Sequence, residues 1–172
     1  GGNMRLAAYP PGKGDITNMI RSYIHRCQKD GVKIVMNCEV TPEIIKEEKP
    51  DSVIIATGSK TLILPIEGID NPAIIHGSDL LDGKRAAGKK VLVVGGGMVG
   101  CETAAFLGEQ EHDVTVIEFR DTVGADVIHE HRVYLMKDFE DYGIKEITGA
   151  KVCKFYEDGV EYETADGVRH ES

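Results

Sequence analysis

The stretch from Val91 to Phe119, VLVVGGGMVGCETAAFLGEQEHDVTVIEF, constrains the fold more than any other part of the chain. Two apolar runs, Val91–Val94 and Val114–Glu118, are typical of strands buried on both faces. Between them lie a glycine-rich turn and a segment, Met98 to about Gln110, with small residues on one side of a predicted helix. The order strand, helix, strand predicts a parallel βαβ unit and therefore an α/β fold.

The glycine-rich turn has the spacing G-x-G-x-x-G, formed by Gly95, Gly97 and Gly100. The first glycine permits a tight turn, the second lets a pyrophosphate approach the backbone, and the third lets the helix pack closely on the strand. The free N–H groups at the helix start, around Met98 and Val99, would then face the phosphates at the positive end of the helix dipole. The spacing alone is a weak indication, but its position between two strands predicts a Rossmann-like dinucleotide site.

An acidic residue, Glu118, ends the second strand 23 residues after Gly95. This is close to the offset of the carboxylate that binds the adenosine ribose in dinucleotide-binding folds. Such a carboxylate accepts hydrogen bonds from the ribose hydroxyls and repels a 2′-phosphate, so it favours NAD over NADP. Arg120 leaves NADP open, because a nearby guanidinium could accommodate the phosphate.

Two residues early in the predicted helix have alternative interpretations. Glu102 is either an acid that interacts favourably with the helix dipole or a group near the nicotinamide end of the cofactor. Cys101 would have a lowered pKa if it were exposed at the helix start, but we expect it to pack. No cysteine has a C-x-x-C partner, so reduced thiols are expected at Cys27, Cys38, Cys101 and Cys153.

The first half of the chain predicts two helices and two strands before an irregular segment. A helix capped by Asp15 is expected to end at Gly31, and a second, with Thr41 as its cap, Pro42 at its first position and Pro50 as its boundary, follows. Two β-rich runs, Val32–Asn37 and the fully apolar Asp51–Ser59, predict strands, the latter buried on both faces. Leu62 to Gly88 is rich in Gly and Pro and predicts a connector.

The last third of the chain continues the regular pattern. An apolar stripe from Val127 to Tyr142 predicts a longer helix that ends at Gly143. A short strand in IKEI and three more in AKVCKFY, VEYET and VRHES follow, with EDG and ADG turns between the last three. Asp-Gly turns between alternating runs predict an antiparallel β-meander.

Composition excludes several classes of function. The net charge of −9 argues against nucleic-acid binding, and no apolar run reaches the length of a membrane span. His129 and His131 lie two residues apart on a predicted helix, so their side chains point in different directions and no metal site is expected. The chain has no initiator Met or signal peptide, and we expect a cytoplasmic protein of which this is an internal piece.

The run VLVVGGGMVGCETAAFL with DVTVIE resembles the NAD-binding domain of the pyridine nucleotide-disulfide oxidoreductase superfamily, in which the acid of G-x-G-x-x-G-x-E is typical; Glu102 matches it. The segments GGNMRLAAYPPGK, VTPEIIKEEKPDSVIIATGSKTLILPIEGID and SDLL resemble the C-terminal region of the 2,4-dienoyl-CoA reductase and enoate reductase group, old-yellow-enzyme-like NADH:flavin oxidoreductases. Together these segments cover nearly the whole chain.

The resemblance implies a domain organisation. Residues 1–81 would be part of an FAD-binding domain that lacks its first βαβ unit, 82–88 a connector, and 89–172 an NAD(P)-binding Rossmann domain truncated at its C-terminal end. The strand that ends in Ala56, Thr57 and Gly58 would lie beside FAD. FMN and a 4Fe-4S cluster are expected only in the rest of the parent protein, whose remaining domains and dinucleotide cofactors are the expected partners.

The resemblance also implies a function. The chain would bind NADH and pass its hydride to FAD, and electrons would continue through the Fe-S cluster and FMN to an activated C=C bond. Alone, the chain is expected to be inactive. Alternatives are another NAD-dependent flavoprotein reductase, a self-contained dehydrogenase, and a non-catalytic nucleotide sensor or interaction module. A dehydrogenase pair at Tyr134 and Lys137 is one residue too close for the short-chain type.

The expected site contains no catalytic and no metal-binding residue. Its cofactor-binding residues are Gly95, Gly96, Gly97, Met98, Val99, Gly100, Glu102, Glu118, Phe119, Arg120, Thr57 and Gly58.

Overall fold

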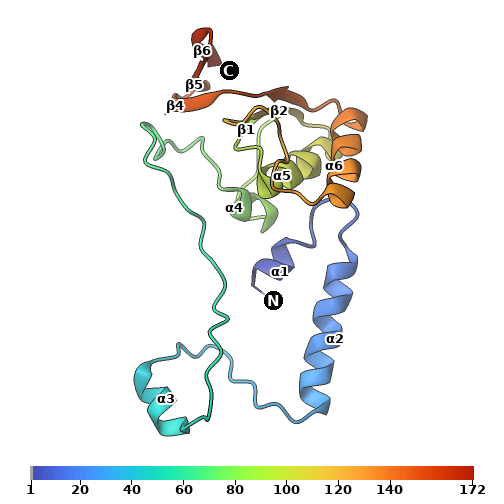
Figure 1. Ribbon diagram of the computed structural model, residues 1–172, viewed down its shortest axis with the longest axis vertical. Coiled ribbons are helices and arrows are strands. Elements are labelled where there is room, and N and C mark those ends of the chain that lie inside the picture. Colours follow the sequence, from blue (N-terminus) through green and yellow to red (C-terminus); the bar gives the residue numbers. More distant parts are fainter. Residues whose placement is uncertain (1) are drawn as a thin grey trace.

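The computed structural model describes residues 2–172. The second half of the chain forms two sheets and two long helices that pack together, whereas part of the first half projects away from them (Figure 1). The projecting part contains α2, α3 and the extended segment that follows α3. The packed part contains the predicted βαβ unit.

A parallel sheet forms the centre of the packed part. Its strands are β1 (Lys90–Val94), β2 (Asp113–Ile117) and β3 (Lys145–Ile147), in the order β1-β2-β3. Helix α5 (Met98–Glu109) connects β1 to β2, and α6 (His129–Asp141) connects β2 to β3. Because parallel neighbours require such crossovers, the two helices lie where the sequence pattern predicts them.

The residues of β1 and β2 alternate between the two faces of this sheet. Val91, Val93 and Val114 pack with α5 and α6 in one hydrophobic cluster, while Leu92 and Ile117 pack in a second cluster on the other face. Both faces are therefore covered, which explains why β1 and β2 carry apolar residues at consecutive positions rather than only at every second one.

A second, antiparallel sheet covers the other face. It contains β4 (Lys151–Phe155), β5 (Val160–Thr164) and β6 (Gly167–Glu171) in sequential order. The turn between β5 and β6 places Gly167 at φ 118°, a conformation that favours glycine. Helices, parallel sheet and antiparallel sheet form three layers, so the predicted α/β fold with an antiparallel meander is confirmed.

The first 81 residues contribute four helices: α1 (Asn3–Leu6), α2 (Asp15–Lys29), α3 (Pro42–Glu48) and α4 (Gly77–Leu81). The two predicted helices are thus present, with Thr41 before α3 and Pro42 as its first residue. Asp15 begins α2 rather than capping it, and none of the residues of α1–α3 is buried. The short α4 was not predicted and lies in the segment Leu62 to Gly88, which was expected to be irregular.

The prediction of two strands in the first half of the chain is wrong. Neither Val32–Asn37 nor Asp51–Ser59 forms a strand, and the second segment is open to solvent, with Ile54 and Ile55 89% and 85% exposed. A strand exists only when a neighbour satisfies its N–H and C=O groups. No strand within residues 2–172 pairs with either segment. The sequence preference of these residues for strands is therefore not realised.

No helix in residues 2–172 combines the length and the apolar character that a membrane crossing requires.

Candidate functional site

The glycine turn between β1 and α5 is closed by backbone contacts that exclude side chains. Gly95 has a φ of 101° and its N–H donates to the Ile117 carbonyl at 2.9 Å. A Cβ on Gly100 would lie 1.8 Å from the Gly95 carbonyl oxygen, which no side chain can tolerate. Glycine is therefore required at both ends of the turn, first by conformation and then by close approach.

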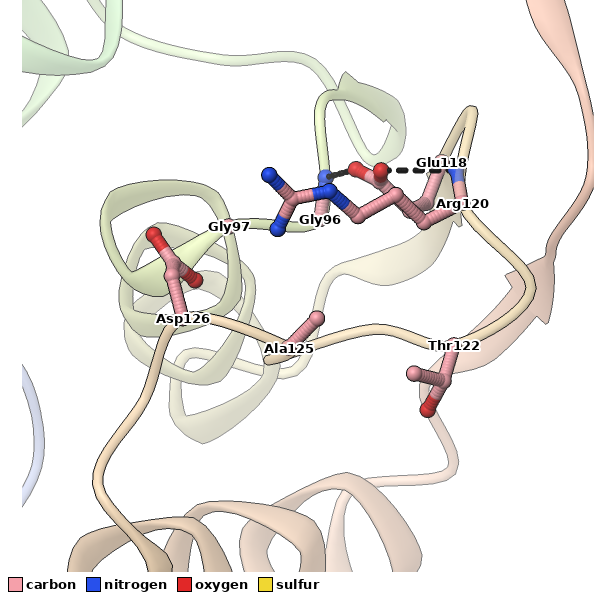
Figure 2. Close-up of a pocket in the computed structure, with 7 residues that line it drawn as sticks. All are labelled: Gly96, Gly97, Glu118, Arg120, Thr122, Ala125 and Asp126. Atoms are coloured by element: carbon pink, nitrogen blue, oxygen red, sulfur yellow. Dashed lines mark hydrogen bonds between the residues drawn. The ribbon is translucent and has the colours of Figure 1, made fainter.

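Glu118 links the turn to the end of β2. Its Oε2 accepts a hydrogen bond from the Gly96 N–H at 2.6 Å, and its Oε1 accepts one from the Arg120 N–H at 2.8 Å (Figure 2). The side chain is almost buried, with 9% of the residue exposed. Each carboxylate oxygen keeps a further acceptor site. The carboxylate is thus fixed in orientation and can still accept hydrogen bonds from two hydroxyl groups.

Gly96, in the middle of the turn, is packed equally closely against the loop after β2. A Cβ on Gly96 would lie 2.9 Å from Cγ1 of Val123. The Gly96 carbonyl accepts hydrogen bonds from the Gly124 N–H at 2.7 Å and from the Cys101 thiol at 3.2 Å. Burial raises the pKa of that thiol to about 11, so Cys101 packs as a neutral group, as we expected from the sequence.

A pocket of about 190 Å³ opens over the turn. Arg120 extends along its side nearest Gly96, and Asp126 lies across from it at the start of α5 (Figure 2). Asp126 Oδ1 accepts a hydrogen bond from the Met98 N–H at 2.9 Å. The residues that line the pocket are Gly96, Gly97, Glu118, Arg120, Thr122, Ala125 and Asp126.

Glu102 lies outside this pocket, on the side of α5 that faces the N-terminal segment and α6. Its Oε1 accepts from the Lys13 ammonium and lies 3.1 Å from Nε2 of His131. Only 8% of Glu102 is exposed, so the Lys13 ammonium offsets the cost of burying the carboxylate charge. Its role therefore includes a structural link between the N-terminal segment, α5 and α6.

The structure brings some of the predicted site residues together and not others. Gly96, Gly97, Glu118 and Arg120 line the pocket, and Gly95, Met98, Val99 and Gly100 belong to the adjoining turn and helix start. Phe119 is 69% exposed beside them. Thr57 and Gly58 lie in the exposed extended segment after α3 and do not line this pocket.

The sequence did not identify Asp126 and Thr122 as pocket residues, nor Lys13 and His131 as partners of Glu102. All four depend on how distant segments meet in space, and no local spacing indicates them. Among residues 2–172, no group of three or more His, Cys, Asp and Glu side chains could hold a metal ion.

A comparison with known protein families shows to which family the chain belongs. The sequence profile of the family described as pyridine nucleotide-disulphide oxidoreductase matches residues 46–171, well over half of the chain. The chain belongs to this family. The predicted superfamily is therefore confirmed.

Relatives support the narrower resemblance to enoate reductases. Bilirubin reductase of Mediterraneibacter gnavus is 32% identical over 167 residues, 97% of this chain and 26% of the relative. Cinnamate reductase of Clostridium sporogenes is 37% identical over 123 residues, 72% of this chain and 18% of the relative. The structure of 2-naphthoyl-CoA reductase, with its naphthoyl-CoA, is 34% identical and superimposes with a TM-score of 0.90, covering 100% of this chain and 26% of that one.

The chain spans about a quarter or less of the length of these proteins. Its residues fit a dinucleotide, because the turn has no room for side chains at Gly96 and Gly100 and the Glu118 carboxylate is oriented beside it. The predicted FAD contacts Thr57 and Gly58 have no neighbouring sheet in residues 2–172.

Proposed function

We propose that this chain is the NADH-binding module of a flavin-dependent reductase related to enoate reductases. The observation that carries the proposal is the Glu118 carboxylate, which is held by the Gly96 and Arg120 N–H groups beside a turn that admits no side chain. This combination of a closed glycine turn and an oriented acid matches the requirements of an adenosine ribose next to a pyrophosphate.

Each part of the site would have a separate task. The first-turn N–H groups of α5 would bind the pyrophosphate, since they have no partners within the helix. The two Glu118 oxygens would accept hydrogen bonds from the 2′- and 3′-hydroxyls of the adenosine ribose. Their negative charge would repel a 2′-phosphate. The protein contributes binding and orientation, while NADH supplies the hydride.

The rest of the reaction would take place outside this chain. We propose that the hydride passes to FAD, and that electrons continue through an iron–sulfur cluster and FMN to an activated C=C bond, as the resemblance to enoate reductases implies. The names of the relatives, bilirubin, cinnamate and 2-naphthoyl-CoA reductase, are consistent with such acceptors. The domain boundaries 1–81, 82–88 and 89–172 and a cytoplasmic location stay predictions.

Calorimetric titration with NADH and NADPH tests the proposal. We expect the wild-type chain to bind NADH more tightly than NADPH. Glu118→Gln should weaken NADH binding about tenfold or more and should affect NADPH much less, because two ribose hydrogen bonds to a charged acceptor are weakened only for NADH. Glu130→Gln, which neutralises an exposed acid at the start of α6, is the matched control and should change neither affinity.

Two results would contradict the proposal. If the wild-type chain bound neither dinucleotide at millimolar concentration, the turn would not be a dinucleotide site. If Glu118→Gln reduced the affinity for both dinucleotides equally, Glu118 would not contact the ribose.

A further inference from the structure

Asp126 lies where the glycine turn meets the N-terminus of α5. Its Oδ1 accepts the Met98 N–H at 2.9 Å, and a Cβ on Gly97 would lie 3.2 Å from its Oδ2. Figure 2 shows its carboxylate beside Gly97, on the opposite side of the pocket from Glu118. The carboxylate is thus bound to a first-turn N–H group of the type that binds phosphate in dinucleotide sites.

The loop that carries Asp126 is fixed against the turn rather than loosely attached. Val123 is fully buried, and the Gly124 N–H donates to the Gly96 carbonyl at 2.7 Å. Arg132 of α6 donates from Nη2 to the Val123 carbonyl at 3.1 Å and to Thr122 Oγ1 at 3.0 Å. These contacts place the Asp126 backbone next to the helix start.

The charge of Asp126 has no cationic partner in the described part of the chain. No Lys, Arg or His nitrogen in residues 2–172 lies within ion-pair distance of it, although Arg120 lines the same pocket. The Met98 N–H is the only hydrogen-bond donor that Asp126 has among these residues. Among these residues the helix N-terminus is therefore the one electrostatic partner of the carboxylate, which is otherwise exposed to solvent.

A carboxylate and a pyrophosphate cannot both use this donor, and their like charges repel one another. We propose that Asp126 is an internal competitor of the pyrophosphate, which must give up the Met98 N–H when a dinucleotide binds. This inference rests on the proposed function and adds a residue that sets the affinity for phosphate-bearing ligands. It predicts that Asp126 weakens the binding of ligands that carry a pyrophosphate and leaves the binding of adenosine unchanged.

Two variants separate the charge of Asp126 from its occupancy of the donor. Asp126→Asn keeps an oxygen that can accept the Met98 N–H but removes the charge, so the helix start keeps its partner. Asp126→Ala removes both. We expect NADH to bind about threefold to tenfold more tightly to Asp126→Asn, the range expected when one like charge is removed beside a helix N-terminus at an exposed site, and at least as tightly to Asp126→Ala as to Asp126→Asn.

The control is Asp121→Asn, in the same loop. Asp121 is also exposed, but its side chain makes no hydrogen bond within residues 2–172. Asp121→Asn removes the same charge at a distance from the helix start, so NADH affinity should stay within about twofold of wild type. A gain equal to that of Asp126→Asn would show a general charge effect and would overturn the competitor role.

The experiment is calorimetric titration of the wild-type chain and the three variants with NADH, ADP-ribose and adenosine. Tighter binding of NADH and ADP-ribose but unchanged binding of adenosine in the two Asp126 variants is the expected result. NADH binding by the wild type with equal or weaker binding by Asp126→Asn would overturn the competitor role and leave the proposed function intact. Failure of NADH to bind to any of the four proteins would overturn both.

Discussion

The Lys13 ammonium is paired with the Glu102 carboxylate, 89 positions further along the chain. Both side chains are largely shielded from solvent, with 22% and 10% of their surfaces exposed. His131 of α6 contacts the same carboxylate oxygen. One acid on α5 therefore connects the segment before α2 to the packed second half of the chain.

Replacing Lys13 with Met should lower the free energy of unfolding by about 1–3 kcal/mol, because it leaves a shielded carboxylate with His131 as its only side-chain partner. Urea denaturation measures this loss, and hydrogen exchange should show faster exchange in α1. Lys33→Met is the matched control: Lys33 pairs with Glu48 in full solvent and should cost less than about 1 kcal/mol. Equal losses in both variants would show that the Lys13 pair has no special structural role.

Gly100→Ala should destabilise the fold by about 3 kcal/mol or more, because the new Cβ would overlap the Gly95 carbonyl oxygen and force the helix away from β1. Thermal unfolding measures the change, and dinucleotide binding should be lost with it. In the control Gly88→Ala the new methyl group meets no atom within 4 Å, so stability should stay near that of wild type. A stable Gly100→Ala protein would contradict the close approach seen here.

Alkylation should distinguish Cys101 from the exposed thiols. Cys38 and Cys153 are exposed, whereas Cys101 is fully buried and burial raises its pKa from an ordinary 9.0 to about 11. At pH 8, iodoacetamide should modify Cys38 and Cys153 and spare Cys101 until the chain is unfolded, as read by peptide mass spectrometry. Rapid labelling of Cys101 in the folded protein would contradict its packing role.

The same pKa shift fixes the sign of the pH dependence. The folded state favours the neutral thiol, so its contribution to stability is complete below the unfolded pKa of about 9 and declines as the pH rises towards 11. Cys101→Ser should remove this slope between pH 9 and 11, while Cys153→Ser should keep it.

Asp126→Ala should lower the free energy of unfolding by about 0.5–1 kcal/mol when no dinucleotide is present, because the Met98 N–H loses its acceptor at the helix start. The same variant is expected to bind NADH more tightly, so stability and affinity should change in opposite directions. Urea denaturation of Asp126→Ala beside Asp121→Ala measures the difference. An unchanged midpoint would mean that water replaces the carboxylate without cost.

The sequence predicts the second half well because its determinants are local. The spacing of Gly95, Gly97 and Gly100 and the Asp-Gly turns near the C-terminus depend only on neighbouring residues. The path of Val32–Asn37 and Asp51–Ser59 is different, because a strand needs partners that local pattern cannot supply. Asp126 was not predicted for a related reason: its contact with Met98 depends on how a loop folds back over the turn.

The exposed segment Asp51–Ser59 has a consequence for handling the protein. It contains Val53, Ile54 and Ile55 in extended form, with no proline and one charged residue among its nine. Uncovered stretches of this composition are templates for intermolecular cross-β stacking. Concentrated solutions of this chain alone should therefore slowly form thioflavin-positive aggregates, and placing a lysine at position 54 should delay them.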